Sequence, residues 1–228
     1  MKKRSRCLLA AALWVAASIG ISAGSKADYA NDFRIWNEFM WTQHKGERWL
    51  AFGYGELRWV DDASHVGAWV LQQKVYHQAN SWLQLGTGPG WIEIEQPDKS
   101  WNTLARLELE ANCIHRLSSG EVFALYNRLE TRWWENRDWE TEYVTRHRLF
   151  YLRSANWLPR MLRYEFSNEL FYDFSENRIN ENRFRPANLF FRLSENSTFN
   201  VFTQVRSLRS KRDGHWSHAY IVGTGLRW

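Results

Sequence analysis

The chain has 228 residues, 44% of them hydrophobic, with 15 Trp and a formal charge of +5. This apolar content excludes a disordered chain, because it is enough to bury a core. The positive charge is concentrated in residues 1–27, which hold five basic and no acidic side chains, and the remainder balances 25 basic against 25 acidic ones. That balance excludes an electrostatic nucleic-acid binder, which needs a surplus of Lys and Arg.

Residues 1–27 have the features of a secretory signal peptide. A basic segment, 1–6, precedes an apolar stretch, 8–21, and small residues stand at −3 and −1 of a cleavage site after Ala27. The apolar stretch is shorter than the roughly 20 residues that a membrane-spanning helix needs. We therefore expect an exported protein whose mature part, 28–228, is a single domain.

Beyond the signal peptide, apolar and polar residues alternate with a period of two, which indicates β-strands. In 103–116, for example, Leu107 and Leu109 lie on one face, and Arg106 and Glu108 lie on the other. Eleven segments show this pattern with more or less regularity. They span residues 33–42, 50–60, 66–76, 82–92, 103–116, 121–134, 142–153, 161–174, 183–193, 199–208 and 218–228.

The length of these segments favours a membrane barrel. They run for about 10 to 14 residues, whereas strands of globular proteins average about 5 to 6 and tilted transmembrane strands need about 9 to 11. Short connectors also alternate with longer polar ones, as they do in outer-membrane barrels. The short ones include 45–47, 118–120 and 194–197, and the longer ones include 96–101, 135–140, 175–182 and 211–216. The fold class expected is an all-β, antiparallel transmembrane β-barrel of about 10–12 strands.

An odd count of eleven conflicts with the even strand number of bacterial outer-membrane barrels. Ten or twelve strands are therefore expected, with two places where the count can be wrong. The first segment can lie outside the barrel, and Pro186, which lacks a ladder donor, marks an edge, a bulge or a break in 183–193. The glycine-rich run from Gly86 to Gly90 is a further place where the ladder can bend or divide.

A soluble periplasmic barrel of the lipocalin type would also show alternation, but with the apolar face inside. Charges of both signs fill one face of several strands here, which would be costly in an apolar cavity. Trp residues gather near the ends of the segments, as in the aromatic girdles of membrane barrels. They are Trp49, Trp59, Trp82, Trp91, Trp101, Trp133, Trp134, Trp139, Trp157 and Trp216.

The charged face predicts a salt-bridged lumen. Its members are Glu56, Arg58, Arg106, Glu108, Glu110, Arg128, Glu130, Arg132, Arg146, Arg148, Arg163, Glu165, Glu169, Arg206 and Arg227. Paired Arg and Glu side chains can fill a small barrel and hold it shut, which indicates a structural or binding role. The alternative function is a narrow outer-membrane channel for small solutes, lined by opposite charges.

Catalysis is a third hypothesis. His215 and Ser217 have the His-x-Ser spacing of an outer-membrane phospholipase, with Asp213 nearby, so an outer-membrane hydrolase is a weak candidate. The simpler interpretation is a polar loop tip, and we expect no enzyme activity. The seven His residues and one mature Cys show no metal-ligand spacing, and no phosphate-binding loop is present. We therefore expect neither a metal nor a cofactor.

The C-terminal strand resembles the assembly signal of bacterial outer-membrane barrels, in which Gly223, Leu226 and the terminal Trp228 fall on the pattern. Ile221 departs from it where a polar residue is usual. The resemblance implies that the barrel assembly machinery is a partner through this strand. Outer-membrane lipid is the other expected partner, nucleic acid is not, and the sequence leaves the oligomeric state open.

Several short motifs also resemble the bacterial exported family called domain of unknown function 2490, over about 33–228. They are Asp32-Phe33-Arg34-Ile35-Trp36, Gly46-Glu47-Arg48-Trp49, Arg146-His147-Arg148-Leu149, Tyr164-Glu165 with Phe171-Tyr172, Glu181-Asn182-Arg183-Phe184 and the closing glycine-rich strand. This resemblance implies a barrel and an envelope location, and it implies no activity. We expect the protein to be located in the bacterial outer membrane.

Overall fold

The structure, a computed structural model, describes residues 32–210 and 213–228, and the predicted signal peptide lies outside them. Within this part of the chain there are eleven strands and one 3-10 turn, η1 (Glu135–Arg137), and no helix is long and apolar enough to span a bilayer. Each predicted segment falls on one strand. The strands are β1 (Asp32–Lys45), β2 (Trp49–Val60), β3 (His65–Gln78), β4 (Leu83–Glu95), β5 (Trp101–Arg116), β6 (Val122–Trp134), β7 (Thr141–Ser154), β8 (Met161–Asp173), β9 (Arg178–Arg192), β10 (Thr198–Arg209) and β11 (Trp216–Arg227).

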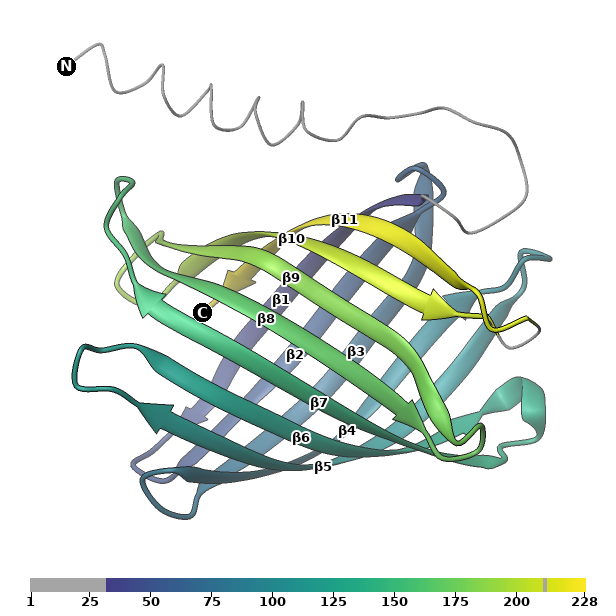
Figure 1. The fold of residues 1–228 in the computed structure, drawn as a ribbon, viewed down its shortest axis with the longest axis horizontal. Helices are drawn as coiled ribbons and strands as arrows, with labels where there is room; N and C mark the ends of the chain where they lie inside the picture. Colours follow the sequence, from purple (N-terminus) through teal and green to yellow (C-terminus); the bar gives the residue numbers. More distant parts are fainter. Residues whose placement is uncertain (1–31, 211–212) are drawn as a thin grey trace, which may run out of the picture.

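The sheet closes on itself, because β1 pairs with both β2 and β11 (Figure 1). The β1–β11 pairing is parallel and runs from Asp32 opposite Ala219 to Met40 opposite Arg227. The expected all-β, mostly antiparallel barrel of about 10–12 strands is confirmed, but the expected even number of ten or twelve is wrong. With eleven strands the first and the last run in the same direction, so only a parallel ladder can pair their edges.

Pro186 lies in a β-bulge and does not break its strand. On the β10 side, Arg185 and Pro186 together oppose Gln204. The register with β8 also shifts, between Glu165 and Ser167. The extra residue lets β9 continue past a proline that has no N–H for the ladder.

The glycine-rich run of β4 is a close approach between two strands. β4 continues through it, but the pairing with β3 is interrupted opposite Gly88 and Pro89. A Cβ atom at Gly88 would lie 1.8 Å from the carbonyl oxygen of Gln73. Only glycine fits here, since any side chain would push β3 and β4 apart.

The two ends of the barrel, named A and B here, have connections of similar length. End A, where β1 begins, carries 61–64, 96–100, 135–140, 174–177 and 210–215; end B, where β11 ends, carries 46–48, 79–82, 117–121, 155–160 and 193–197. Connections of four to six residues at end A face connections of three to six at end B. The expected contrast between short turns and longer loops is therefore wrong. The strands extend into the predicted loops: β9 already begins at Arg178, after a turn in which Asn177 adopts φ +49°.

Inside the barrel, three apolar clusters surround the polar side chains. One, formed by β5, β6 and β7, contains Ile114, Val122, Ala124 and Phe150. A second contains Val70, Ile92 and Leu104. The third contains Trp36, Phe202 and Ile221 and lies beneath the seam where β1 meets β11. The interior is thus filled by side chains, and the charged residues are packed between these clusters.

The last residue closes the seam at end B. The Trp228 N–H donates to the Met40 carbonyl at 3.0 Å, and the Thr42 N–H donates to the Trp228 carbonyl at 2.7 Å. Its indole stacks on Trp41 with 6.5 Å between ring centroids, and Trp41 in turn covers the Cα of Gly53. The terminal residue therefore joins β1, β2 and β11.

We expect Trp228→Ser to lower the free energy of unfolding by about 1 to 3 kcal/mol, because the seam loses a ring stack and its buried apolar area. The compact, heat-modifiable fraction on unboiled gels should fall, while export and leader removal proceed normally. Trp139→Ser is the matched control, since Trp139 is similarly exposed on a connection at end A. Equal loss of the compact form in both variants would contradict a specific role for Trp228.

Candidate functional site: the charged interior

The antiparallel registers of β5, β6 and β7 bring charged side chains together. Glu110 is opposite Arg128, and Arg128 is opposite Arg146. Directly opposite residues of neighbouring strands point to the same face of a sheet, so these three side chains all point inward. The fifteen residues that the sequence assigns to the lumen all lie on the inward face, as their burial and their contacts show.

Glu130 is the centre of the largest network and has no solvent-exposed surface. Its carboxylate lies 2.6 Å from Arg132 and 2.7 Å from Arg146. Arg128 and Arg106 complete the shell at 3.4 and 3.9 Å. A carboxylate with four guanidinium neighbours satisfies its lone pairs, which is the condition for burying a charge at tolerable cost.

Lys74 joins this network from β3, and it is not among the residues that the sequence assigned to the lumen. Its ammonium pairs with both Glu108 and Glu110, and its side chain is 3% exposed. Glu110 also accepts a hydrogen bond from the Tyr76 hydroxyl at 2.8 Å. The signal in the sequence is weak, because Lys74 shares its face of β3 with the apolar residue Val70.

A second network centres on Glu181 of β9, which pairs with Arg183 and, at 2.7 Å, with Arg206. Glu56 and Arg58 of β2 form another pair at 2.5 Å. The sequence pattern assigns Glu56, Arg58 and Arg206 to the lumen but not Glu181 and Arg183, because the bulged β9 has no regular alternation.

Aromatic rings connect the networks. Arg58 and Arg183 contact the Trp36 ring at 4.6 and 5.5 Å from its centroid. Arg183 and Arg146 contact the Phe171 ring at 4.5 and 4.4 Å. Both rings are about 2% exposed. Guanidinium groups therefore alternate with aromatic faces across the lumen, an arrangement that favours Arg over Lys.

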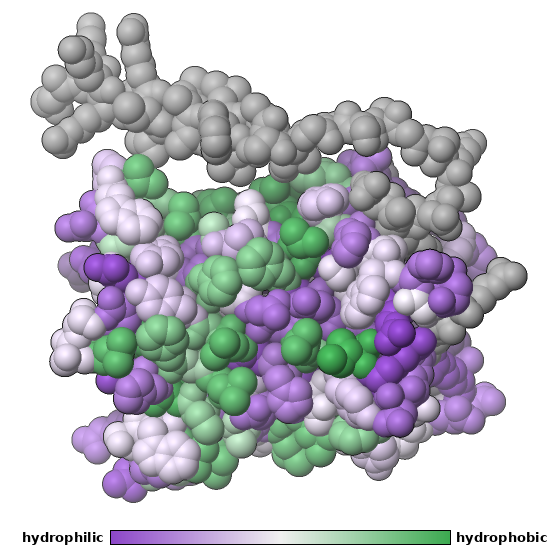
Figure 2. All heavy atoms as spheres, viewed as in Figure 1, coloured by the Kyte–Doolittle hydropathy of each residue, from purple (hydrophilic) through white to green (hydrophobic). Residues whose placement is uncertain are grey.

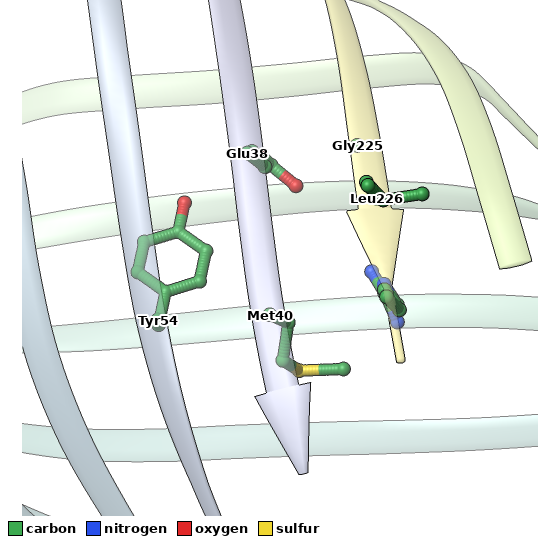
Figure 3. Close-up of a pocket in the computed structure, with 6 residues that line it drawn as sticks. Glu38, Met40, Tyr54, Gly225 and Leu226 are labelled. Atoms are coloured by element: carbon green, nitrogen blue, oxygen red, sulfur yellow. The ribbon is translucent and has the colours of Figure 1, made fainter. Parts of the chain in front are cut away.

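Arg185 connects the bulge to the seam. Its guanidinium lies 3.1 Å from Glu38 of β1 and donates to Gln204 at 3.0 Å. It also covers the Phe202 ring at 3.7 Å. Glu38 and Tyr54 lie beside a cavity of about 20 Å³ between β1, β2 and β11 (Figure 3). A space of this size holds about one water molecule, so this part of the lumen is nearly filled.

The remaining lumen residues differ in their partners. Glu165 pairs with Arg148, and Glu169 pairs with Arg146 at 2.8 Å. Arg163 and Arg227 instead contact the ring of Phe190.

The C-terminal residues of the predicted assembly signal lie on both faces of β11. Gly223 faces inward beneath the Phe202 ring, and a Cβ atom at this position would lie 2.0 Å from that ring. Leu226 faces outward, and Trp228 closes the seam. In this structure these residues make barrel contacts, while the predicted contact with assembly machinery stays a prediction.

The structure places His215 and Ser217 at end A, His215 in the connection before β11 and Ser217 within β11. The Ser217 hydroxyl donates to the Leu208 carbonyl at 3.4 Å, and the His215 N–H donates to the Asp213 carboxylate at 3.0 Å. Hydrogen bonds from the Ser210 hydroxyl and the His215 backbone hold the Asp213 pKa below its usual range. Asp213 therefore orders the connection. The hydrolase hypothesis stays a weak prediction.

Within 32–210 and 213–228, no three His, Cys, Asp or Glu side chains are grouped to hold a metal ion. The described molecule is a closed eleven-stranded barrel with a filled, ion-paired interior. The chain matches the family model described as protein of unknown function (DUF2490) over residues 26–216, and it belongs to that family. No curated protein and no solved structure matches it significantly.

We expect Glu130→Gln to destabilise the refolded barrel by about 3 to 5 kcal/mol, because four guanidinium groups lose their shared carboxylate. Denaturant unfolding of refolded protein measures the change. Glu121→Gln is the control, since Glu121 pairs at 3.6 Å with an exposed Arg153 and should change stability little. Similar destabilisation by both substitutions would show that burial of the pair is unimportant.

Proposed function

We propose that the protein is an integral β-barrel of the bacterial outer membrane with a structural or binding role and a lumen closed to solutes. The observation that carries this proposal is that apolar side chains are exposed on the outer wall, while the charged side chains at neighbouring positions are buried inside. Leu107 and Leu109 are 40% and 53% exposed, while Glu108 between them is 0% exposed. A soluble barrel with a ligand cavity has the opposite arrangement, so this distribution disfavours the lipocalin-like alternative.

The outer wall supports the membrane location. Large apolar side chains are exposed along the strands, among them Leu71, Leu129 and Leu149. Exposed Trp residues lie at both ends: Trp49, Trp82, Trp157 and Trp228 at end B, and Trp101, Trp139 and Trp216 at end A. Apolar strand centres with indole rings at the ends match the hydrocarbon band and the aromatic girdles of membrane barrels.

The outer wall is not uniformly apolar. Figure 2 shows green and purple patches interleaved on one face. Two of the polar side chains on the outer wall, Asn127 and His147, hydrogen bond to each other at 2.9 Å, and Ser207 and His218 do the same at 2.9 Å. Mutual hydrogen bonding lowers the cost of placing these groups against lipid.

The filled interior favours a closed barrel over the channel alternative. Trp36, Phe171, Phe190 and Phe202 occupy the lumen and are at most 2% exposed. Ion pairs fill the space between the rings, as described above. A solute path would have to displace both, and each displacement leaves a buried charge without a partner.

Single-channel recording tests the closed lumen. Refolded protein inserted into a planar bilayer should give no steady conductance, because rings and ion pairs block the interior. Insertion is verified in parallel by the heat-modifiable form recovered from the same lipid. Steady conductance from inserted protein would favour the channel alternative and contradict the closed lumen.

A depth-dependent substitution tests the membrane location. Leu129→Arg, near the middle of β6 on the outer wall, should cost about 2 to 4 kcal/mol in lipid vesicles, because it places a cation near the bilayer midplane. Tyr143→Arg, on the outer wall near end A, should cost about 0 to 1 kcal/mol. Denaturant unfolding in vesicles measures both. Equal costs at the two depths would argue against a membrane-spanning barrel.

A further inference from the structure

The charged residues near end B are unevenly distributed. The connections at this end, together with the three nearest residues of each adjoining strand, contain eight basic side chains and only three acidic ones. The basic residues are Lys45, Arg48, Arg116, Arg153, Arg160, Arg163, Arg192 and Arg227, and the acidic ones are Glu47, Glu121 and Glu195. A rim with this balance attracts anions, and the attraction is strongest where several cations converge.

The cations converge where β8, β9 and β11 reach end B. Arg163 and Arg227 both contact the ring of Phe190, at 4.5 and 4.8 Å from its centroid, so their guanidinium carbons are less than 10 Å apart. Arg160 and Arg192 lie alongside, since the Arg192 N–H donates to the Arg160 carbonyl at 2.8 Å. The backbones of four arginines thus lie close together at one part of the rim.

These guanidinium groups lack the carboxylate partners found elsewhere in the lumen. Among the residues that the structure describes, no carboxylate lies within 4 Å of Arg163 or Arg227, and the buried Nε of Arg163 has no hydrogen-bond acceptor. The neighbouring carboxylate on β8, Glu165, pairs with Arg148 and attracts Arg163 and Arg227 only from beyond 4 Å. An arginine does not lose its proton in a protein, so the cluster stays positively charged and can bind a further anion.

We propose that Arg163 and Arg227, at the mouth of the lumen near end B, form a binding site for a phosphate group, either free or carried by an anionic lipid headgroup that reaches the rim. Guanidinium donors bind phosphate oxygens in pairs, and two such groups less than 10 Å apart can bind one phosphate between them. Trp157 and Trp228 are exposed at the same end, where indole rings favour the headgroup region. The phosphate site does not depend on the proposed membrane location. Only the binding of a lipid phosphate rests on that proposal.

The first arm of the test uses inorganic phosphate and the refolded mature protein in detergent. Calorimetric titration compares the natural chain with the double variant Arg163→Gln/Arg227→Gln, which should bind at least about tenfold more weakly, since a lost charge-assisted pair is worth about one order of magnitude or more. Arg153→Gln is the matched control, because Arg153 belongs to the same rim but already pairs with Glu121. It should bind phosphate as the natural chain does.

The second arm uses phosphatidylcholine vesicles with and without phosphatidylglycerol. Mass spectrometry of gently extracted barrels should detect bound phosphatidylglycerol on the natural chain and on Arg153→Gln, and less on the double variant. Heat modifiability of each sample reports insertion separately, so a failure of the membrane proposal is distinguished from a failure of the site. Phosphate binding without lipid binding would support the site with a soluble source.

If the Gln variant does not become compact, the variant Arg163→Lys/Arg227→Lys replaces it, because it keeps both positive charges. It should bind phosphate more weakly than the natural chain, because a lysine cannot donate in a fork. Equal phosphate and lipid binding by the natural chain and a compact double variant would overturn the proposal. Absence of both kinds of binding in the natural chain would overturn it as well.

Discussion

Closure of the backbone ladder is the constraint on which the rest of the barrel depends. An unpaired edge strand leaves N–H and C=O groups without partners, and the pairing of β1 with β11 satisfies them. Because they run in the same direction, they meet through slanted parallel bonds, which are slightly weaker than antiparallel ones. Side chains reinforce this seam: Asn37 donates to Thr224 at 2.9 Å, Glu38 of β1 pairs with Arg185, and Trp41 stacks on Trp228.

Closure then determines how the interior is filled. Many charged side chains on the inward faces of the strands are buried away from water. Each of these buried ions therefore needs partners in the protein. Carboxylates such as Glu130 are shared by several guanidinium groups, and the faces of Trp36 and Phe171 take up cations that remain. Planar guanidinium groups donate in a fork and stack on rings, whereas the Lys74 ammonium pairs with Glu108 and Glu110 as a compact point charge.

Most of the fold could be predicted from the alternation of apolar and polar residues. A strand has a side-chain period of two, and this period can be recognised without tertiary information. It located all eleven strands and turned Arg106, Glu108, Arg128 and Glu130 inward. The odd strand number was not predicted, because the even numbers typical of outer-membrane barrels were preferred to the count of eleven. Glu38, Lys74 and Arg185 were missed because their strands mix apolar and polar residues on one face or contain a bulge. Pairing between residues distant in the sequence requires the register, which one sequence does not contain.

The odd strand number has a consequence for how the chain can be rearranged. β1 begins at end A and β11 ends at end B, although the two strands are neighbours. Twelve residues of β11 rise by about 3.3 Å each, so these two chain positions are separated by about the length of the barrel wall. In ordinary up-and-down barrels a short turn can connect the ends of the chain. A circular permutant of this barrel would instead need a linker long enough to run from one mouth to the other.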